Sequence, residues 1–424
     1  MIIEHRSSLR GEITVPGDKS ISHKAILLSS LAKGISEIDG VFMTEDCLST
    51  IDCFRKMNVH IEIQPNNKLR ISGNGLYGLS EPKSVLNTGK SNTALRLLLG
   101  VLVGQKFRST VDRDISVQRK PIYDMVKPLK YMGANIIGRE DANMCPLIIS
   151  PSKLIPKTHE LELENRYVKS SILLASLYTE GETIIKEKVP YRNHTELMLN
   201  YFGAELSYKD GSIISHKCKQ LQHKHVTIPG DISIASYFIV AACIIPNSEI
   251  LIKNVGYNHT RNGLIEVLKN MGAKIDIINE HLVGNEVFAD IHVCSSNLTG
   301  ISIDNSIIPR LYDELPALIV AACVASGKTV ISDLKGYKIY ESGLLEKLNN
   351  ELIKMGANIR TTSDSIEIIG KEQLNGKVVE SYNNKTLTLA LATAGMYAMD
   401  ETLIRKSQVL ETTFPDFLPV LNSL

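Results

Sequence analysis

One short phrase recurs five times along the chain, and it restricts the possible folds more than any other feature. In four copies an apolar residue is followed by Gly-Ala. The copies lie roughly 70 to 85 positions apart, at Met57, Met132, Phe202, Met271 and Met355. This spacing is too long for a solenoid and suits one supersecondary unit per copy. An amphipathic helix precedes each phrase and a strand follows it, so the glycine is expected to supply the left-handed turn at the helix end.

A second recurring piece lies upstream of each phrase. It is an almost wholly apolar run of small residues, followed by Gly or Asn and a β-branched segment, and it occupies residues 25–38, 94–104, 170–185, 235–251 and 315–331. A helix that is apolar on every side must be buried on every side. Each unit is therefore predicted to read β-α-β-α-β-β, with its first helix inside the domain and its second more exposed. A sixth copy begins near Lys385 and stops without its last strands.

The length of 424 residues exceeds what one hydrophobic core usually supports, so two domains are expected. The N-terminal segment reads as a lone hairpin that completes the C-terminal half. The chain then crosses between the halves twice, at the Pro-Gly breaks of Pro16 and Pro229. This predicts a first domain of residues 18–225 and a second of residues 1–17 plus 226–424, with three repeats in each.

The charge balance argues against nucleic-acid and membrane partners. The 47 basic and 46 acidic residues leave a net charge of +1, which creates no long-range field. The longest apolar run, near Tyr237–Pro246, is too short to span a bilayer, and a cytoplasmic protein is expected. The seven cysteines form no CxxC pair or Cys/His cluster at metal spacing, so no metal is predicted.

Two helix starts carry the side chains of an anion site. Residues 16–24 read Pro-Gly-Asp-Lys-Ser-Ile-Ser-His-Lys, which places Lys19, Ser20 and Lys24 where exposed N–H groups and the helix dipole attract negative charge. An ordinary capped helix with solvated lysines would look the same. The second repeat begins in the same way, with Lys90 before the helix and Arg96 one turn in. Equivalent helix starts of neighbouring repeats are expected to face one cleft.

Carboxylates stand at the corresponding place in the second half. Asp313 and Glu314 precede an apolar helix, where a carboxylate serves either as a cap or as a general base that reaches a substrate hydroxyl. Glu341 is a second candidate acid, although a single glutamate is more commonly a surface residue.

Seven segments together resemble the 5-enolpyruvylshikimate-3-phosphate synthase family, in order and across nearly the whole chain. They are PGDKSISHKAILLSSLA, GKSNTALRLLLG, RNHTELML, PGDISIASYFIVAA, NHTRNGLIEVLKNMGA, IIPRLYDELPAL and TFPDF. The resemblance implies an α/β fold of two domains and six repeats, the inside-out α/β barrel. It implies transfer of the carboxyvinyl group of phosphoenolpyruvate to a hydroxyl of shikimate 3-phosphate, with no metal or organic cofactor, by a monomer that binds small phosphorylated anions.

Four residues match the family's functional positions. Lys19 corresponds to a lysine for phosphoenolpyruvate and Ser20 to a serine for the shikimate phosphate. Asp313 corresponds to the proton-accepting aspartate and Glu341 to the proton-donating glutamate.

Other positions depart from the family pattern. Lys24 and Lys120 replace arginines, which keeps the charge but loses the bidentate fork. Lys90 belongs to a Lys-Ser-Asn-Thr run where the family has Asn-Ser-Gly-Thr. The family's Ser-Ser-Gln reads Asn165-Arg166-Tyr167, and its next acceptor-binding serine reads Tyr191. In the second half Tyr340, Leu344, Lys385 and Thr412 mark places where the family's cations or histidine are replaced, with Lys385 as a gained charge. The predicted substrate-binding residues are Ser20, Lys24, Lys90, Lys120, Arg166, Tyr167, Tyr191, Tyr340 and Lys385.

Three functions remain open on the sequence. The first is a carboxyvinyl transferase that uses Asp313 as base, Glu341 as acid, and Lys19 with Lys120 to neutralise the phosphate. The second is an enzyme of the same fold with a changed acceptor or chemistry, in a specialised-metabolite pathway. The third is a catalytically inactive binding homologue. The new side chains at Asn165-Arg166-Tyr167 and Tyr191 favour the second function. The absence of the family's cations from the second half favours the third.

Overall fold

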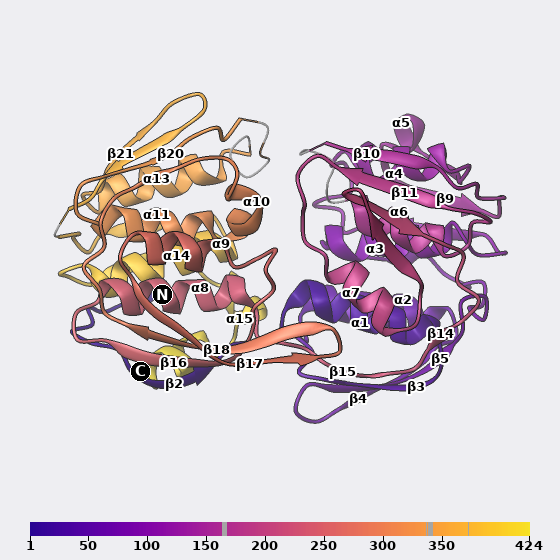
Figure 1. Cartoon of the computed structure of the whole chain (residues 1–424), viewed down its shortest axis with the longest axis horizontal. Coiled ribbons are helices and arrows are strands. Elements are labelled where there is room, and N and C mark those ends of the chain that lie inside the picture. The colour runs from indigo at the N-terminus through magenta and orange to yellow at the C-terminus, as the bar shows by residue number, and fades with distance from the viewer. Residues whose placement is uncertain (163–167, 336, 338–341, 372) are drawn as a thin grey trace. The chain divides into compact units, whose positions relative to one another are not determined.

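The computed structural model describes residues 1–162, 168–335, 337, 342–371 and 373–424. They form two compact units. The first unit comprises residues 17–228 and 283–286, and the second comprises residues 1–16, 229–282 and 287–424. Figure 1 labels the elements of both units. None of the described helices combines the length and apolar composition that a membrane crossing requires.

The first unit contains three repeats, and each has an inner helix, an outer helix and a small sheet. Their elements are α1 (Lys19–Leu31), β3 (Ala32–Asp39), α2 (Glu45–Lys56), β4 (His60–Gln64) and β5 (Lys68–Asn74); β6 (Leu86–Asn87), α3 (Asn92–Leu102), β7 (Ser109–Asp112), α4 (Tyr123–Tyr131), β8 (Asn135–Gly138), α5 (Arg139–Ala142) and β9 (Met144–Ser150); and β10 (Thr158–Leu161), α6 (Lys169–Ser176), β11 (Thr183–Glu187), α7 (His194–Tyr201), β12 (Leu206–Lys209), β13 (Ser212–Ser215), β14 (Leu221–Gln222) and β15 (His225–Thr227).

The second unit repeats this arrangement. Its elements are β1 (Ile2–Ile3), β2 (Arg10–Thr14), α8 (Ile232–Ile244), β16 (Glu249–Gly256), α9 (Gly263–Asn270), β17 (Lys274–Val283) and β18 (Glu286–Cys294); β19 (Ser302–Ile303), α10 (Ile308–Leu311), the 3-10 helix η2 (Tyr312–Glu314), α11 (Leu315–Val324), β20 (Lys328–Ile331), α13 (Leu344–Lys354), β21 (Asn358–Thr361) and β22 (Ile366–Ile369); and β23 (Val378–Glu380), α14 (Lys385–Tyr397), β24 (Thr402–Arg405), α15 (Val409–Thr413) and α16 (Phe417–Asn422). The predicted α/β fold of six repeats, three per unit, is confirmed.

The sheets share one topology. In the order β6-β7-β9-β8, the first strand runs parallel to the strand that follows the inner helix, and a closing hairpin pairs antiparallel. In two repeats, the parallel edge strand comes from a distant part of the chain. The β14 and β15 strands run parallel to β3, and β2 runs parallel to β16. The short β1 strand pairs antiparallel with β24 in the incomplete sixth repeat.

The two helices of each repeat differ in burial as their sequences require. Nearly every residue of α8 and α11 is buried, whereas α9 buries one face. The inner helices α8, α11 and α14 pack against one another within the second unit (Figure 1).

The recurring phrase ends each outer helix as predicted. Gly133, Gly203, Gly272 and Gly356 have φ angles of 92°, 91°, 95° and 99°, and Asn58 has a φ of 66° at the same place in the first repeat. These left-handed residues stop the outer helices and turn the chain into the hairpins.

Candidate functional site

The start of α1 carries the first of the two anion-binding groups that the sequence predicted. Asp18 caps the helix by accepting a hydrogen bond from the backbone N–H of Ile21 at 2.8 Å. Lys19 and Ser20 then occupy the first turn, and Lys24 follows one turn later. The Nζ of Lys24 donates to the Oγ of Ser20 at 2.6 Å and to its carbonyl oxygen at 3.3 Å. The structure therefore brings Ser20 and Lys24 together as one polar group.

Two arginines from other parts of the first unit act electrostatically on Lys24. Burial lowers the pKa of its ammonium to about 8; Asp18 and Glu286 oppose this shift, while Arg96 and Arg192 add to it. Arg96 comes from α3, and Arg192 precedes α7. The inner helix starts of two repeats thus contribute charge to one place, which favours a bound anion.

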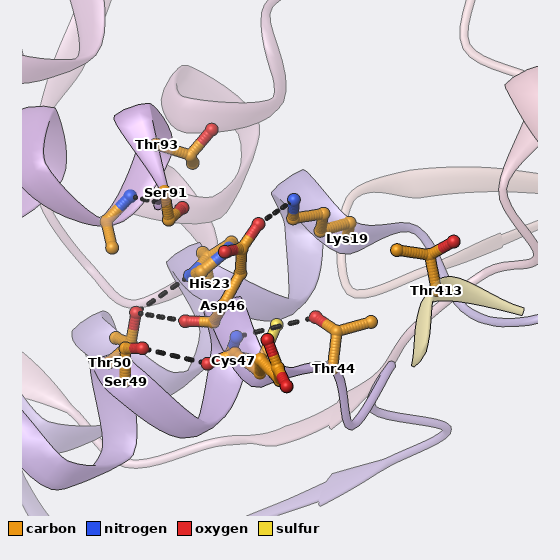
Figure 2. Close-up of polar contacts among 12 residues, drawn as sticks. Lys19, His23, Thr44, Asp46, Cys47, Ser49, Thr50, Ser91, Thr93 and Thr413 are labelled. Atoms are coloured by element: carbon orange, nitrogen blue, oxygen red, sulfur yellow. Dashed lines mark hydrogen bonds and ion pairs between the residues drawn. The ribbon is translucent and has the colours of Figure 1, made fainter. Parts of the chain in front are cut away.

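Lys19 reaches the second helix of its own repeat. Its ammonium forms an ion pair with the carboxylate of Asp46 in the first turn of α2 (Figure 2). The side chains of Lys19 and Asp46 are 38% and 21% exposed, so solvent reaches both. A competing anion could exchange with Asp46 at this lysine.

His23 lies beneath the helix start and is buried. Its Nδ1 lies 2.8 Å from the Oγ1 of Thr50, and Thr50 itself donates to the carbonyl oxygen of Asp46 at 3.4 Å (Figure 2). Burial, followed by the charges of Lys19, Lys24 and Arg96, holds the pKa of His23 well below its ordinary value. A neutral imidazole supports the helix start from inside.

Two other predicted lysines lie on the surface. Lys90 is exposed in the turn before α3 and interacts electrostatically with Asp114. In the same turn Ser91 caps α3 by accepting from the N–H of Ala94 at 3.1 Å. Lys120 is exposed between β7 and α4.

Tyr191 is buried and takes part in a network around α6. The Nζ of Lys169 donates to the carbonyl oxygen of Tyr191 at 3.0 Å, and the guanidinium of Arg192 lies 5.4 Å from the centre of the Tyr191 ring. Lys169 also contacts the carboxylates of Glu187 at 3.0 Å and Glu196 at 2.7 Å. Arg166 and Tyr167, also predicted to bind substrate, lie outside the described residues.

In the second unit, Asp313 lies in η2, immediately before α11, and its side chain is half-buried. Its neighbour Glu314 is fully buried and accepts from Arg261 at 3.0 Å and from the hydroxyl of Ser233 at 2.5 Å. The buried network engages Glu314, whereas Asp313 keeps partial solvent exposure. Of the two carboxylates that the sequence singled out, Asp313 is therefore better placed for chemistry.

The starts of three inner helices meet near Asp313. Burial raises the pKa of the Tyr237 phenol on α8, with further contributions from Glu314, Asp313 and Asp231. The Tyr237 hydroxyl donates at 3.4 Å to the carbonyl oxygen of Thr386, in the first turn of α14. Lys385, the first residue of α14, is half-buried there. Glu341 and Tyr340 lie outside the described residues.

Sequence reasoning missed the residues that position these groups. Asp46, Thr50 and Lys169 carry no local motif, and they meet their partners through the packing of α2 and α6. A sequence signal existed only for the helix of Tyr237. That helix begins with Pro-Gly-Asp-Ile-Ser, which repeats the Pro-Gly-Asp-Lys-Ser of the first helix start.

The comparisons with known proteins agree along the whole chain. The family model described as EPSP synthase (3-phosphoshikimate 1-carboxyvinyltransferase) matches residues 3–421. A protein of Thermoanaerobacter sp. (strain X514) named 3-phosphoshikimate 1-carboxyvinyltransferase is 44% identical over 422 residues, covering 100% of this chain and 99% of its own. One with the same name from Desulforamulus reducens is 42% identical over 424 residues, with the same coverage. A solved EPSP synthase from Acinetobacter baumannii superimposes with a TM-score of 0.92 at 35% identity, covering 100% of this chain and 97% of that one.

Proposed function

The chain belongs to the EPSP synthase family, a family of transferases, and from that premise we propose that it transfers the carboxyvinyl group of phosphoenolpyruvate to a hydroxyl of shikimate 3-phosphate and releases inorganic phosphate. The full-length identity of 42 to 44% to proteins named for this reaction supports the proposal.

The observation that carries the proposal is the cluster of cations around the α1 start. Lys24, Arg96 and Arg192 interact electrostatically, and Lys19 lies one turn from Lys24. Both reactants are phosphorylated, and a charge-assisted hydrogen bond contributes about 1.5–3 kcal/mol. In this proposal Lys19 neutralises the phosphate of phosphoenolpyruvate together with Lys120, and Ser20 donates to the phosphate of the acceptor.

Asp313 is the proposed general base of the second unit. It accepts the proton of the acceptor hydroxyl while that oxygen bonds to the second carbon of phosphoenolpyruvate. Glu341 protonates the methylene carbon, a role assigned from the family resemblance alone. The resulting tetrahedral adduct then loses a methyl proton and the phosphate, which restores the carbon-carbon double bond. Atoms and charges balance without a cofactor.

A second candidate is the same transfer to an altered acceptor. It is favoured by the buried Tyr191, whose ring contacts Arg192 and whose carbonyl oxygen is held by Lys169 at the position of the family's acceptor-binding serine. Tyrosine in place of serine moves the hydroxyl to the far end of an aromatic ring and adds apolar bulk.

Phosphate release from phosphoenolpyruvate tests both candidates. The first predicts release that requires shikimate 3-phosphate and is abolished by Glu341→Gln. It also predicts a loss of at least about a hundredfold in kcat for Asp313→Asn, as expected for a missing general base. Lys68→Met, which removes an exposed ion pair with Asp39 in the first unit, is the matched control and should keep full activity.

The outcomes separate the three functions. Release with another phosphorylated alicyclic acceptor, but not with shikimate 3-phosphate, would favour the second candidate. Binding of phosphorylated ligands without any release would indicate an inactive binding homologue and overturn the proposal.

A further inference from the structure

Three metal-binding side chains lie together on the solvent face of one sheet in the second unit. Glu249 begins β16, and His292 and Cys294 lie near the end of β18. The two strands run antiparallel, and Glu249 is the direct cross-strand partner of Cys294. Side chains alternate along a strand, so His292 and Cys294 point outward while Ile291 and Val293 enter the core with 0% exposure. Strand pairing therefore gathers the three side chains on one face.

The donor atoms are close enough to share one ion. The Nε2 of His292 lies 3.1 Å from the Oε1 of Glu249 and 3.9 Å from the Sγ of Cys294. All three donor atoms lie within 4.8 Å of one another. Zinc bonds of about 2.0 to 2.3 Å at tetrahedral angles separate neighbouring ligands by about 3.3 to 3.7 Å. Small side-chain rotations would bring these atoms to that spacing.

A fourth side chain lies beside the histidine. The Oδ2 of Asp276, on the neighbouring strand β17, lies 3.7 Å from the Nδ1 of His292. A carboxylate on one ring nitrogen directs the other nitrogen toward a metal and increases its basicity.

From this arrangement we propose that Glu249, His292 and Cys294 bind a divalent zinc-type cation, with Asp276 orienting the histidine. One thiolate, one imidazole and one carboxylate suit a borderline-soft ion, and water completes a tetrahedral shell. The cation ties β16 to β18 and lies outside the helix starts assigned to the reaction. The sequence indicated no metal site because its cysteines and histidines lack the usual spacing, and Glu249 is more than forty positions away from its partners.

Cys294 makes the site easy to observe. The other six cysteines are buried, and Cys294 alone among the seven is partly exposed. Titration of the full chain with cobalt(II) should therefore give a thiolate charge-transfer band that saturates at one equivalent. The band should disappear in Cys294→Ser, and the affinity should fall at least about tenfold in His292→Gln and in Asp276→Asn.

His60→Gln is the matched control. His60 pairs with the carboxylate of Glu62 at 2.9 Å on a strand of the first unit. The pair lacks a thiolate, so the variant should bind cobalt as the unmodified protein does. A saturating band that survives Cys294→Ser, or no band at all, would overturn the proposal.

A second measurement needs no variant. Zinc(II) should slow the alkylation of Cys294 by iodoacetamide in the folded protein, and the modified residue can be identified by peptide mass spectrometry. It should also raise the thermal unfolding temperature as its concentration increases. An alkylation rate that zinc leaves unchanged would contradict the site even if every variant failed to fold.

Discussion

The ammonium of Lys24 lies 2.6 Å from the hydroxyl oxygen of Ser20, one turn earlier on α1. An ammonium can only donate, so the Ser20 oxygen accepts this hydrogen bond. The hydroxyl hydrogen of Ser20 can then be donated to another acceptor. A phosphate at the helix start would receive that hydrogen together with the positive charge of Lys24. The pair explains how two residues of one helix turn can serve as one anion-binding group.

The first prediction concerns pH. The pKa of Lys24 is lowered to about 8 in the protein without ligand, and a bound anion favours the charged form. Above about pH 8 the lysine must take up a proton when the anion binds, so the affinity for shikimate 3-phosphate falls as pH rises, by at most about tenfold per pH unit. Calorimetry between about pH 7 and about pH 9.5 measures the slope. Lys24→Arg stays charged and should flatten it; an equally steep slope in this variant would exclude Lys24 as the source.

The second prediction concerns Asp46, which holds Lys19 in an ion pair. If a ligand phosphate must displace this carboxylate, Asp46→Asn should tighten phosphoenolpyruvate binding by up to about fivefold, the range of a partly exposed pair. Asp52→Asn is the control, because it breaks a 2.8 Å pair with Lys56 on the same helix, away from Lys19. Weaker binding in Asp46→Asn would show that Asp46 supports the ligand instead of competing with it.

The third prediction concerns the buried Arg261. Arg261→Met leaves Glu314, which is 1% exposed, without its cation, and should lower the free energy of unfolding by about 3–5 kcal/mol. Lys328→Met removes a half-exposed pair with Glu367 and should cost about 0–1 kcal/mol. The chain has no tryptophan, so denaturant unfolding is best followed by circular dichroism. Equal losses in the two variants would contradict the network, and Arg261→Met combined with Glu314→Gln should recover part of the loss.

The fourth prediction uses the repeats as their own control. Gly272 ends α9 with a φ of 95°, and Gly272→Ala should lower the free energy of unfolding by about 1–2 kcal/mol. Gly272→Asn should lower it less, because Asn58 already occupies the equivalent place in the first repeat with a φ of 66°. A greater loss in the asparagine variant than in the alanine variant would refute this account of the recurring phrase.

Local signals were sufficient to predict the repeats but not the contacts between elements. The Gly-Ala phrase and the apolar helices depend on neighbouring residues, so they identified six units from sequence. The pairing of Leu221 with Ala32 adds an edge strand to the first sheet, and it joins residues nearly two hundred positions apart. No local pattern encodes it.

The residues of the candidate site also differ in whether a local sequence pattern marks them. Lys19, Ser20 and Asp313 could be proposed from the sequence because helix starts have a sequence signature. Asp46 and Arg261 were missed because their roles arise only when separate helices pack together. The sequence could not distinguish Glu314 from Asp313. The structure distinguishes them, because Glu314 is buried and paired with Arg261.

Phosphorus NMR of the complete reaction tests carboxyvinyl transfer to shikimate 3-phosphate most directly. With phosphoenolpyruvate and shikimate 3-phosphate present, we predict inorganic phosphate and a carboxyvinyl ether of shikimate 3-phosphate in equal amounts, both absent with Asp313→Asn over the same time. Unchanged phosphoenolpyruvate, or phosphate formed while shikimate 3-phosphate stays intact, would contradict the account.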